Sequence, residues 1–363
     1  MKKHPVPRLA ACGLVSLFGA GGAMAAGPAS SLNLYGVLDA CLVSYQSATG
    51  APWQVNGGGC YYGSRFGFRG NEDLGGGLHA YFVLEGGFAV DTGLQAQGRA
   101  FGRKSLVGLG GSLGAIEAGR DYSPTFYLQT PIDPMQQGIG GALSTMWSGS
   151  PGTSAGRTDN AVSYASPAYG GFSTRLQYAF GEQTGPLPTG GGASKGANLM
   201  YRSKALVAGA AYASVRNSAD DGSDTATTLG ARYDFGRFTL SALAQSGAWE
   251  GTHTAAAPAS ATSLYSRRFR SYVVGGTIKF GADRLRATYK RYDDRTVSNF
   301  DAKILSAVYV HPLSKRTQLY LGVSHLKNVR GSSYGAFDGN GYYKGVAAGG
   351  SSRIIDLGIA HFF

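Results

Sequence analysis

One repeating pattern dominates the chain from about residue 31 onward: roughly ten residues with apolar side chains at alternate positions, followed by a turn. Segment 172–180 (FSTRLQYAF) shows it, with Phe172, Leu176 and Tyr178 on one face and Arg175 on the other. Successive side chains of a β-strand point to opposite faces, so each segment has an apolar side and a polar side. About sixteen such strands without a competing helical pattern predict a closed sheet that is apolar outside and polar inside.

We therefore expect an all-β fold: a 16-stranded antiparallel transmembrane β-barrel with short periplasmic turns, long extracellular loops and an inward-folded constriction loop. No segment after the leader has the ~18 consecutive apolar residues of a membrane helix. The mean hydropathy of −0.10 also fits a secreted soluble protein, which is the alternative. The expected strands span residues 32–45, 63–72, 77–89, 99–110, 115–121, 159–167, 172–181, 196–203, 205–215, 226–235, 238–249, 269–280, 284–293, 302–311, 317–327 and 352–363.

The connections between these strands alternate in length. Short ones such as 73–76 and 281–283 carry the Gly and Asp residues of tight hairpins, whereas the others are longer. An even number of strands lets 32–45 pair with 352–363 and close the ring, which satisfies every backbone group that lipid could not. The longest connection, about 122–158, carries Met135, Met146 and Trp147. We expect it to fold into the lumen, the alternative being disorder on the outer surface.

The first 25 residues have the composition of an export signal. Lys2, Lys3 and Arg8 precede an apolar run, and small residues up to Ala25 supply a cleavage site. We expect two parts: 1–25, the signal peptide, and 26–363, a single barrel domain.

The chain is basic, with 33 Lys and Arg residues against 21 Asp and Glu residues and a net charge of +12. Removing the leader lowers the net charge to +9. Because the charges are scattered singly along strands and form no patch, we expect no nucleic-acid partner. We expect them to line a water-filled passage that favours anions.

Other chemistry has little support in the sequence. The histidines are dispersed without metal-ligand spacing, so we expect no metal and no cofactor. No grouping of a Ser, a His and an acidic residue stands out, so we expect no enzyme activity. Cys41 and Cys60 are bridged or free, and the sequence leaves both open. A barrel enzyme and a plugged structural barrel remain alternatives from other classes.

Five segments carry further information: SLNLYGVLDA (31–40), SRFGFRGNEDLGGGL (64–78), FVLEGGF (82–88), FGR (101–103) and LGIAHFF (357–363). Together they resemble the general porins of beta-proteobacteria. The resemblance spans the chain after the leader and is densest before residue 125.

This resemblance implies a homotrimer of sixteen-stranded barrels in the Gram-negative outer membrane, each a passive channel for small hydrophilic solutes and ions. It also implies that the third long loop narrows each pore and that arginines on the facing wall set ion preference. Phe363 would be part of the signal read by the outer-membrane assembly machinery. A substrate-specific channel for a small anionic solute is the nearest alternative.

Alternation places Arg65, Arg69 and Arg175 on the side of the strands that we expect to line the pore. The resemblance implies the same for Arg103, which matches the family's wall arginine. We also expect Arg120, at the end of strand 115–121 just before the long loop, to line the pore, and the constriction loop to contribute Asp133. We expect one or two of the arginines to pair with Asp39, Glu85 or Glu117. Phe101 and Arg103 share one nominal parity, so a bulge or the end of the strand must intervene.

Overall fold

The structure is a computed structural model that describes residues 30–46, 53–136, 138, 156–181, 191–217, 220–248, 250, 268–296, 299–335 and 346–363. The predicted leader, residues 1–25, lies outside this part of the chain. So do Met146 and Trp147 of the longest connection.

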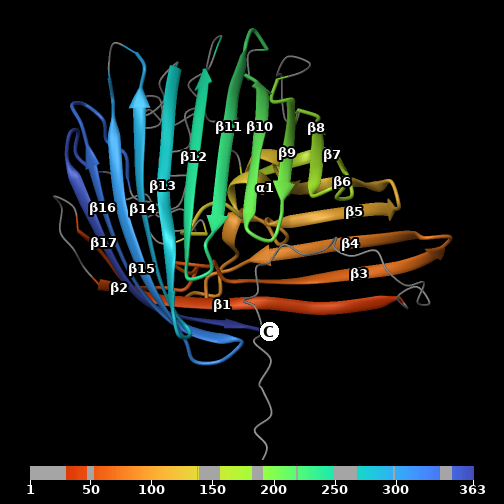
Figure 1. Ribbon diagram of the computed structural model, residues 1–363, viewed down its shortest axis with the longest axis horizontal. Helices are drawn as coiled ribbons and strands as arrows, with labels where there is room; N and C mark the ends of the chain where they lie inside the picture. The colour runs from red at the N-terminus through yellow and green to blue at the C-terminus, as the bar shows by residue number, and fades with distance from the viewer. Residues whose placement is uncertain are drawn as a thin grey trace, which may run out of the picture.

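The described strands form one antiparallel sheet of 17 strands. They are β1 (Ser31–Gln46), β2 (Trp53–Asn56), β3 (Arg65–Gly75), β4 (Leu78–Gly87), β5 (Lys104–Gly111), β6 (Gly114–Tyr122), β7 (Arg157–Ala165), β8 (Phe172–Ala179), β9 (Ser194–Arg202), β10 (Leu206–Arg216), β11 (Ser223–Asp234), β12 (Phe238–Ala248), β13 (Arg268–Phe280), β14 (Asp283–Asp294), β15 (Ala302–Pro312), β16 (Thr317–Asn328) and β17 (Ser351–Phe362). All except β2 form a ring in chain order, and this ring is the predicted 16-stranded barrel (Figure 1).

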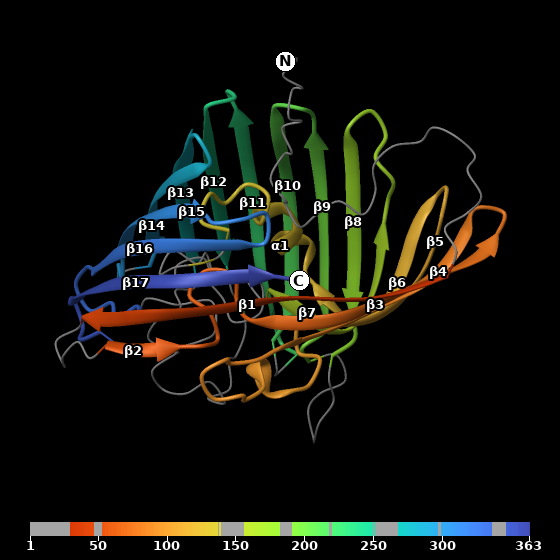
Figure 2. The ribbon, with the colours of Figure 1, turned by 90° about the horizontal axis from the view of Figure 1, so that it is seen from below.

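The ring closes between the first and last long strands. Residues 37–46 of β1 pair with β17, and residues 31–37 pair with β3 on the other edge. Phe363 extends the closure, because its backbone exchanges two hydrogen bonds of 3.1 Å with Gly36. The C-terminus therefore lies against β1, as Figure 2 shows. No sheet edge faces lipid along this seam, which is what a strand-built membrane protein requires.

One predicted boundary needs correction, and one short strand was missed. β5 begins at Lys104 and not at 99, because the short 3-10 helix η1 (Ala96–Gly98) and an irregular stretch precede it. This strand end resolves the parity conflict between Phe101 and Arg103. The four residues of β2 pair with 41–44 of β1 and were missed, since so short a run shows no clear alternation.

Alternation of side chains between the two faces is confirmed along the ring. On β16, Leu319, Leu321 and Val323 are exposed on the outside, while Tyr320 and Ser324 face inward and are buried. The same order holds in β8, where Phe172, Leu176 and Tyr178 face outward as expected. Within the described residues, no helix is long and apolar enough to cross a bilayer.

The segment after β6 folds into the lumen, as predicted for the constriction loop. Its helix α1 (Pro124–Gln129) starts at Ser123, whose Oγ accepts the Phe126 amide at 3.2 Å. α1 lies inside the ring of strands in both views and contacts β8 to β11 (Figures 1 and 2). Leu128 and Ile132 are buried there against inward-facing apolar side chains of β9, β10, β12 and β13.

Glycines in the wall make room for this loop. A Cβ at Gly209 of β10 would meet the carbonyl oxygen of Leu199 and lie 2.8 Å from Leu128 Cδ1. One at Gly230 of β11 would meet Leu243 Cδ2 and lie 3.0 Å from Ile132 Cδ1. Because Gly209 and Gly230 carry no side chain, α1 and the residues after it can lie flat on the strands.

We expect Gly209→Val to destabilise the barrel by roughly 1–3 kcal/mol, because the added side chain overpacks the wall under α1. The measurement is the temperature at which the folded band in detergent converts to the unfolded band on a gel. Ala210→Val places the same volume on the outward parity of the same strand and is the control. Equal conversion temperatures for the two variants would contradict this packing.

Candidate functional site

One inner segment was not anticipated from the sequence. Residues 57–64, expected in the connection 46–62 and at the start of strand 63–72, are mostly buried inside the barrel. The inward-facing Asp39 of β1 holds them. Its Oδ2 accepts the amides of Tyr61 at 3.0 Å, Tyr62 at 2.5 Å and Gly63 at 3.2 Å. Its Oδ1 accepts the Tyr320 hydroxyl at 2.5 Å. The prediction that Asp39 pairs with an arginine is therefore wrong, because backbone donors occupy this carboxylate.

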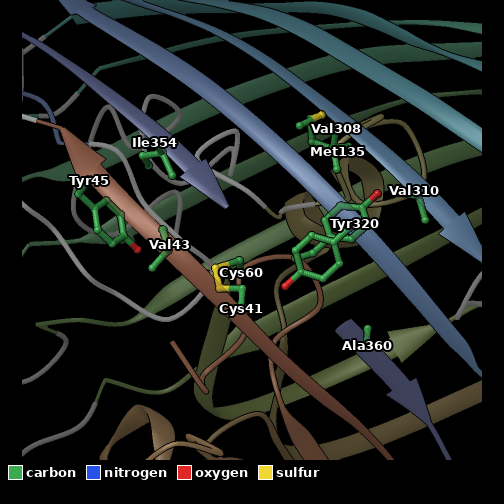
Figure 3. Packing of buried hydrophobic residues seen from close by; sticks show 11 residues of the cluster. Cys41, Val43, Tyr45, Cys60, Met135, Val308, Val310, Tyr320, Ile354 and Ala360 are labelled. Atoms are coloured by element: carbon green, nitrogen blue, oxygen red, sulfur yellow. A yellow bond between two sulfur atoms is a disulfide. The ribbon is translucent and has the colours of Figure 1, made fainter. Parts of the chain in front are cut away.

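A disulfide between Cys41 and Cys60 ties the same segment to β1, with their Cα atoms 6.1 Å apart. This settles the choice that the sequence left open. Figure 3 shows the bridge within the same cluster of buried side chains as Tyr320 and Met135. Met135 belongs to the constriction loop and is fully buried in this cluster, so the two inner segments pack together against β15, β16, β17 and β1.

Glu85 lies at the centre of the first charge cluster. Arg103 Nε donates to its Oε1 at 2.7 Å, and Arg65 Nε lies 3.8 Å from its Oε2. Tyr35 Oη donates to Oε2 at 3.0 Å. Arg103 also donates to the Tyr122 hydroxyl at 3.0 Å. Two guanidinium groups thus share one carboxylate, which leaves this group with a positive surplus.

A second cluster follows along the same wall. Arg175 Nη1 lies 2.5 Å from Glu117 Oε2 and 3.3 Å from Asp121 Oδ2. Lys104 Nζ lies 2.7 Å from Asp121 Oδ1 and donates to the Tyr127 hydroxyl at 2.7 Å. The arginine carbon Cζ of Arg175 also lies 4.3 Å from the centre of the Tyr127 ring. Because Tyr127 belongs to α1, this network fixes the constriction loop to the charged wall.

Arg120 departs from the predicted set. It pairs with Ser105 of β5. Its neighbour Asp121 and Glu117, three residues before it, both face inward, so Arg120 belongs to the outward-facing set of β6. Its Nη1 lies 2.5 Å from Asp159, which also pairs with Arg99 at 3.1 Å. The prediction that Arg120 lines the pore is corrected by this parity.

Pairing is more extensive than expected. We expected one or two arginines to pair, but Arg65, Arg103, Arg120 and Arg175 all form ion pairs with carboxylates. Arg69 faces inward, forms no ion pair with a described residue, and lies 5.3 Å from the centre of the Tyr35 ring. Cations nonetheless outnumber carboxylates two to one around the two clusters. The cations are Arg65, Arg69, Arg103, Lys104, Arg157 and Arg175, and the carboxylates are Glu85, Glu117 and Asp121.

The facing wall adds cations that we did not single out from the sequence. Arg232 of β11 donates to the Pro131 carbonyl at 2.6 Å, and Arg286 of β14 donates to the Pro134 carbonyl at 3.3 Å. Arg286 also donates to the Tyr61 hydroxyl. Lys290, 1% exposed, has no hydrogen-bond partner among the described residues.

Asp133, the acid predicted on the loop, lies on this side. It is buried, its Oδ1 accepts the Met135 amide at 3.1 Å, and its charge acts on Lys290. Alternation was a usable signal for these cations, because the exposed Leu285 and Tyr289 place Arg286 and Lys290 on the inner face.

Tyr61 and Tyr127 of the two inner segments add hydrogen-bond donors and no negative charge. Burial raises the pKa of Tyr61 well above its ordinary value, against the opposing effect of Arg286. Burial likewise raises the pKa of Tyr127, although the charge of Lys104 acts to lower it. Both therefore remain neutral at physiological pH. The described residues contain no group of three or more His, Cys, Asp or Glu side chains that could hold a metal ion.

Comparison with known proteins agrees with this architecture. A family model described as Gram-negative porin matches residues 9–331. The outer membrane porin protein 32 of Delftia acidovorans is 33% identical over 96% of this chain and 98% of its own length. An outer membrane porin protein of Bordetella pertussis is 29% identical over 85% of this chain and 92% of its own.

Among solved structures, the chain is similar to the anion-selective porin from Comamonas acidovorans. The TM-score is 0.78 at 30% identity, covering 92% of this chain and all of that one.

Proposed function

Since the chain belongs to the Gram-negative porin family and so resides in the outer membrane, we propose that its barrel passes small anions in preference to cations. The observation that carries the preference is the excess of cations over carboxylates around the lumen clusters beside the constriction loop. In a narrow tube with low-dielectric walls, such a surplus raises the local concentration of anions and repels cations. The similarity to a porin described as anion-selective supports the same direction.

Transport is passive and the channel is general for small hydrophilic solutes. The test is conductance in a planar bilayer with one ion replaced at a time. Replacing chloride by the slower acetate should reduce the stepwise conductance more than replacing potassium by the slower lithium. The reverse order would contradict anion preference, and the absence of current steps would contradict a channel.

A substrate-specific anion channel is the alternative, favoured by the buried Lys290 and Arg286 beside the loop. It would show saturable block of the current by its solute at low concentration. We propose no catalysis in the lumen, and turnover of a lipid or peptide by the purified barrel would oppose this.

Three further parts of the proposal concern export, assembly and insertion. Residues 1–25 are an export signal, which sequencing of the N-terminus of the membrane-inserted protein would test. The barrels assemble as a homotrimer, and a single-barrel mass in mild detergent would contradict it. Phe363 contributes to recognition by the assembly machinery, so its deletion should lower the amount of inserted protein.

We expect Arg103→Ala to lower the chloride-to-potassium permeability ratio by roughly two- to tenfold, because one cation leaves a partly desolvated tube and Glu85 keeps only Arg65. The ratio is measured from current in a salt gradient. Arg237→Ala removes an exposed charge from the short turn between β11 and β12 and is the control. An unchanged ratio in Arg103→Ala would show that this side chain does not act on passing ions.

A further inference from the structure

Arg157 of β7 is a cation beside the first charge cluster that has no carboxylate of its own. It forms no ion pair with any residue that the structure describes, and its Nε has no hydrogen-bond partner there. Lys303 and Lys327, by contrast, are exposed on the outer face, so the expectation that the scattered charges line the passage is wrong for those two. Arg157 is held next to the lumen arginines by an uncharged side chain, that of Tyr122.

A single oxygen atom holds two guanidinium groups together. Tyr122 Oη accepts Arg103 Nη2 at 3.0 Å and Arg157 Nη2, also at 3.0 Å. A phenol oxygen accepts two hydrogen bonds at most, so these two bonds use its full capacity as an acceptor. Like charges that are this close repel each other, more strongly in a partly desolvated wall than in water. The hydroxyl therefore keeps the two arginines in positions that they would not take by themselves.

The ring of Tyr122 is fixed by the constriction loop and by the wall. Phe126 of α1 stacks on it, with the ring centres 4.3 Å apart and the ring planes inclined by 6°. Arg157 Cζ lies 4.7 Å and Lys104 Nζ 5.1 Å from the centre of the Tyr122 ring. The Tyr122 carbonyl accepts Gln177 Nε2 at 3.2 Å. The hydroxyl thus approaches the arginines from a position that packing and hydrogen bonds define.

An irregularity in the pairing of β6 with β7 brings Tyr122 directly opposite Arg157. The register shifts between Gly119 and Asp121, where β7 has one residue more than β6. Gly119 has a φ of +130°, which a residue with a side chain rarely adopts. Without the extra residue, Tyr122 would lie opposite Thr158, which carries no charge. The bulge therefore directs the tyrosine to the arginine, as bulges do at functional positions of other sheets.

We propose that Tyr122 is a positioning residue for anion passage, whose hydroxyl oxygen holds Arg103 and Arg157 as one fixed pair of charges where the constriction loop begins. This inference rests on the proposed anion preference of the pore. Arg103 has a second anchor in Glu85, whereas Arg157 depends on Tyr122. Once the oxygen is removed, repulsion moves Arg157 away from Arg103 and into bulk water, where salt screens its charge.

The test is the chloride-to-potassium permeability ratio of Tyr122→Phe, taken from the zero-current potential of a bilayer in a salt gradient. Phenylalanine keeps the stacked ring and removes only the acceptor. We expect the ratio to fall roughly two- to fourfold below that of the wild type. Tyr164→Phe is the control, because it removes a hydroxyl from the outer face of β7, where that group donates to the Leu113 carbonyl. Its ratio should equal that of the wild type.

A double-mutant comparison separates positioning from a merely structural role. Arg157→Ala should lower the ratio of the wild type by a similar factor. In the Tyr122→Phe background it should change the ratio by less than about 1.5-fold, because the charge has already left its position. An unchanged ratio in either single variant, or equal effects of Arg157→Ala in both backgrounds, would overturn the inference. A wild-type pore without anion preference would instead contradict the proposed function.

Discussion

Replacing Asp39 by alanine is expected to lower the unfolding temperature of the barrel and to raise its single-channel conductance. The carboxylate is 0% exposed and accepts three backbone amides and the Tyr320 hydroxyl. A buried donor left without a partner costs roughly 1–3 kcal/mol, so losing four at once should exceed about 3 kcal/mol. The segment 57–64 would then lose its main anchor inside the lumen and obstruct the passage less.

The disulfide between Cys41 and Cys60 remains as a second tether in this variant. We therefore expect the gain in conductance to be larger under reducing conditions. Asp73→Ala is the matched control, because that carboxylate is exposed and accepts one amide, that of Gly75, in a short turn. Wild-type conductance and wild-type unfolding temperature in Asp39→Ala would show that the carboxylate does not hold the inner segment.

Neutralising Glu85 is expected to strengthen anion preference. In Glu85→Gln, the guanidinium groups of Arg65 and Arg103 lose the carboxylate that they share, while the amide preserves the shape of the side chain. One unit of negative charge removed from the lumen should raise the chloride-to-potassium permeability ratio roughly two- to tenfold, depending on the effective dielectric constant. The ratio comes from the zero-current potential of a bilayer holding the variant.

Glu72→Gln is the control for this change. Glu72 lies on the outward parity of β3 near the periplasmic end, so the same charge is removed outside the passage. Its permeability ratio should equal that of the wild type. A fall in the ratio for Glu85→Gln would mean that the released arginines no longer face passing ions.

Local patterning was sufficient to predict the barrel. Alternation along each strand depends on neighbours two residues apart, and it located all sixteen long strands with small errors at their ends. β2 escaped because four residues do not establish a period, and the start of β5 was misplaced because 99–103 has strand-like composition without strand conformation.

The pairing of charges could not be predicted in the same way. Arg175 and Glu117 meet from strands 58 residues apart, and Asp39 meets Tyr320 across 281 residues. Such contacts depend on the curvature of the closed sheet and on the inner segments, which alternation does not encode. Alternation does predict that Arg286 and Lys290 face inward, because their neighbours Leu285 and Tyr289 face outward.

The central claim is that the charge surplus of the lumen makes the pore prefer anions, and the zero-current potential of the wild-type protein tests it most directly. The measurement uses a planar bilayer with potassium chloride at tenfold different concentrations on the two sides. The potential should shift toward the equilibrium potential of chloride. A shift toward the equilibrium potential of potassium would contradict the claim.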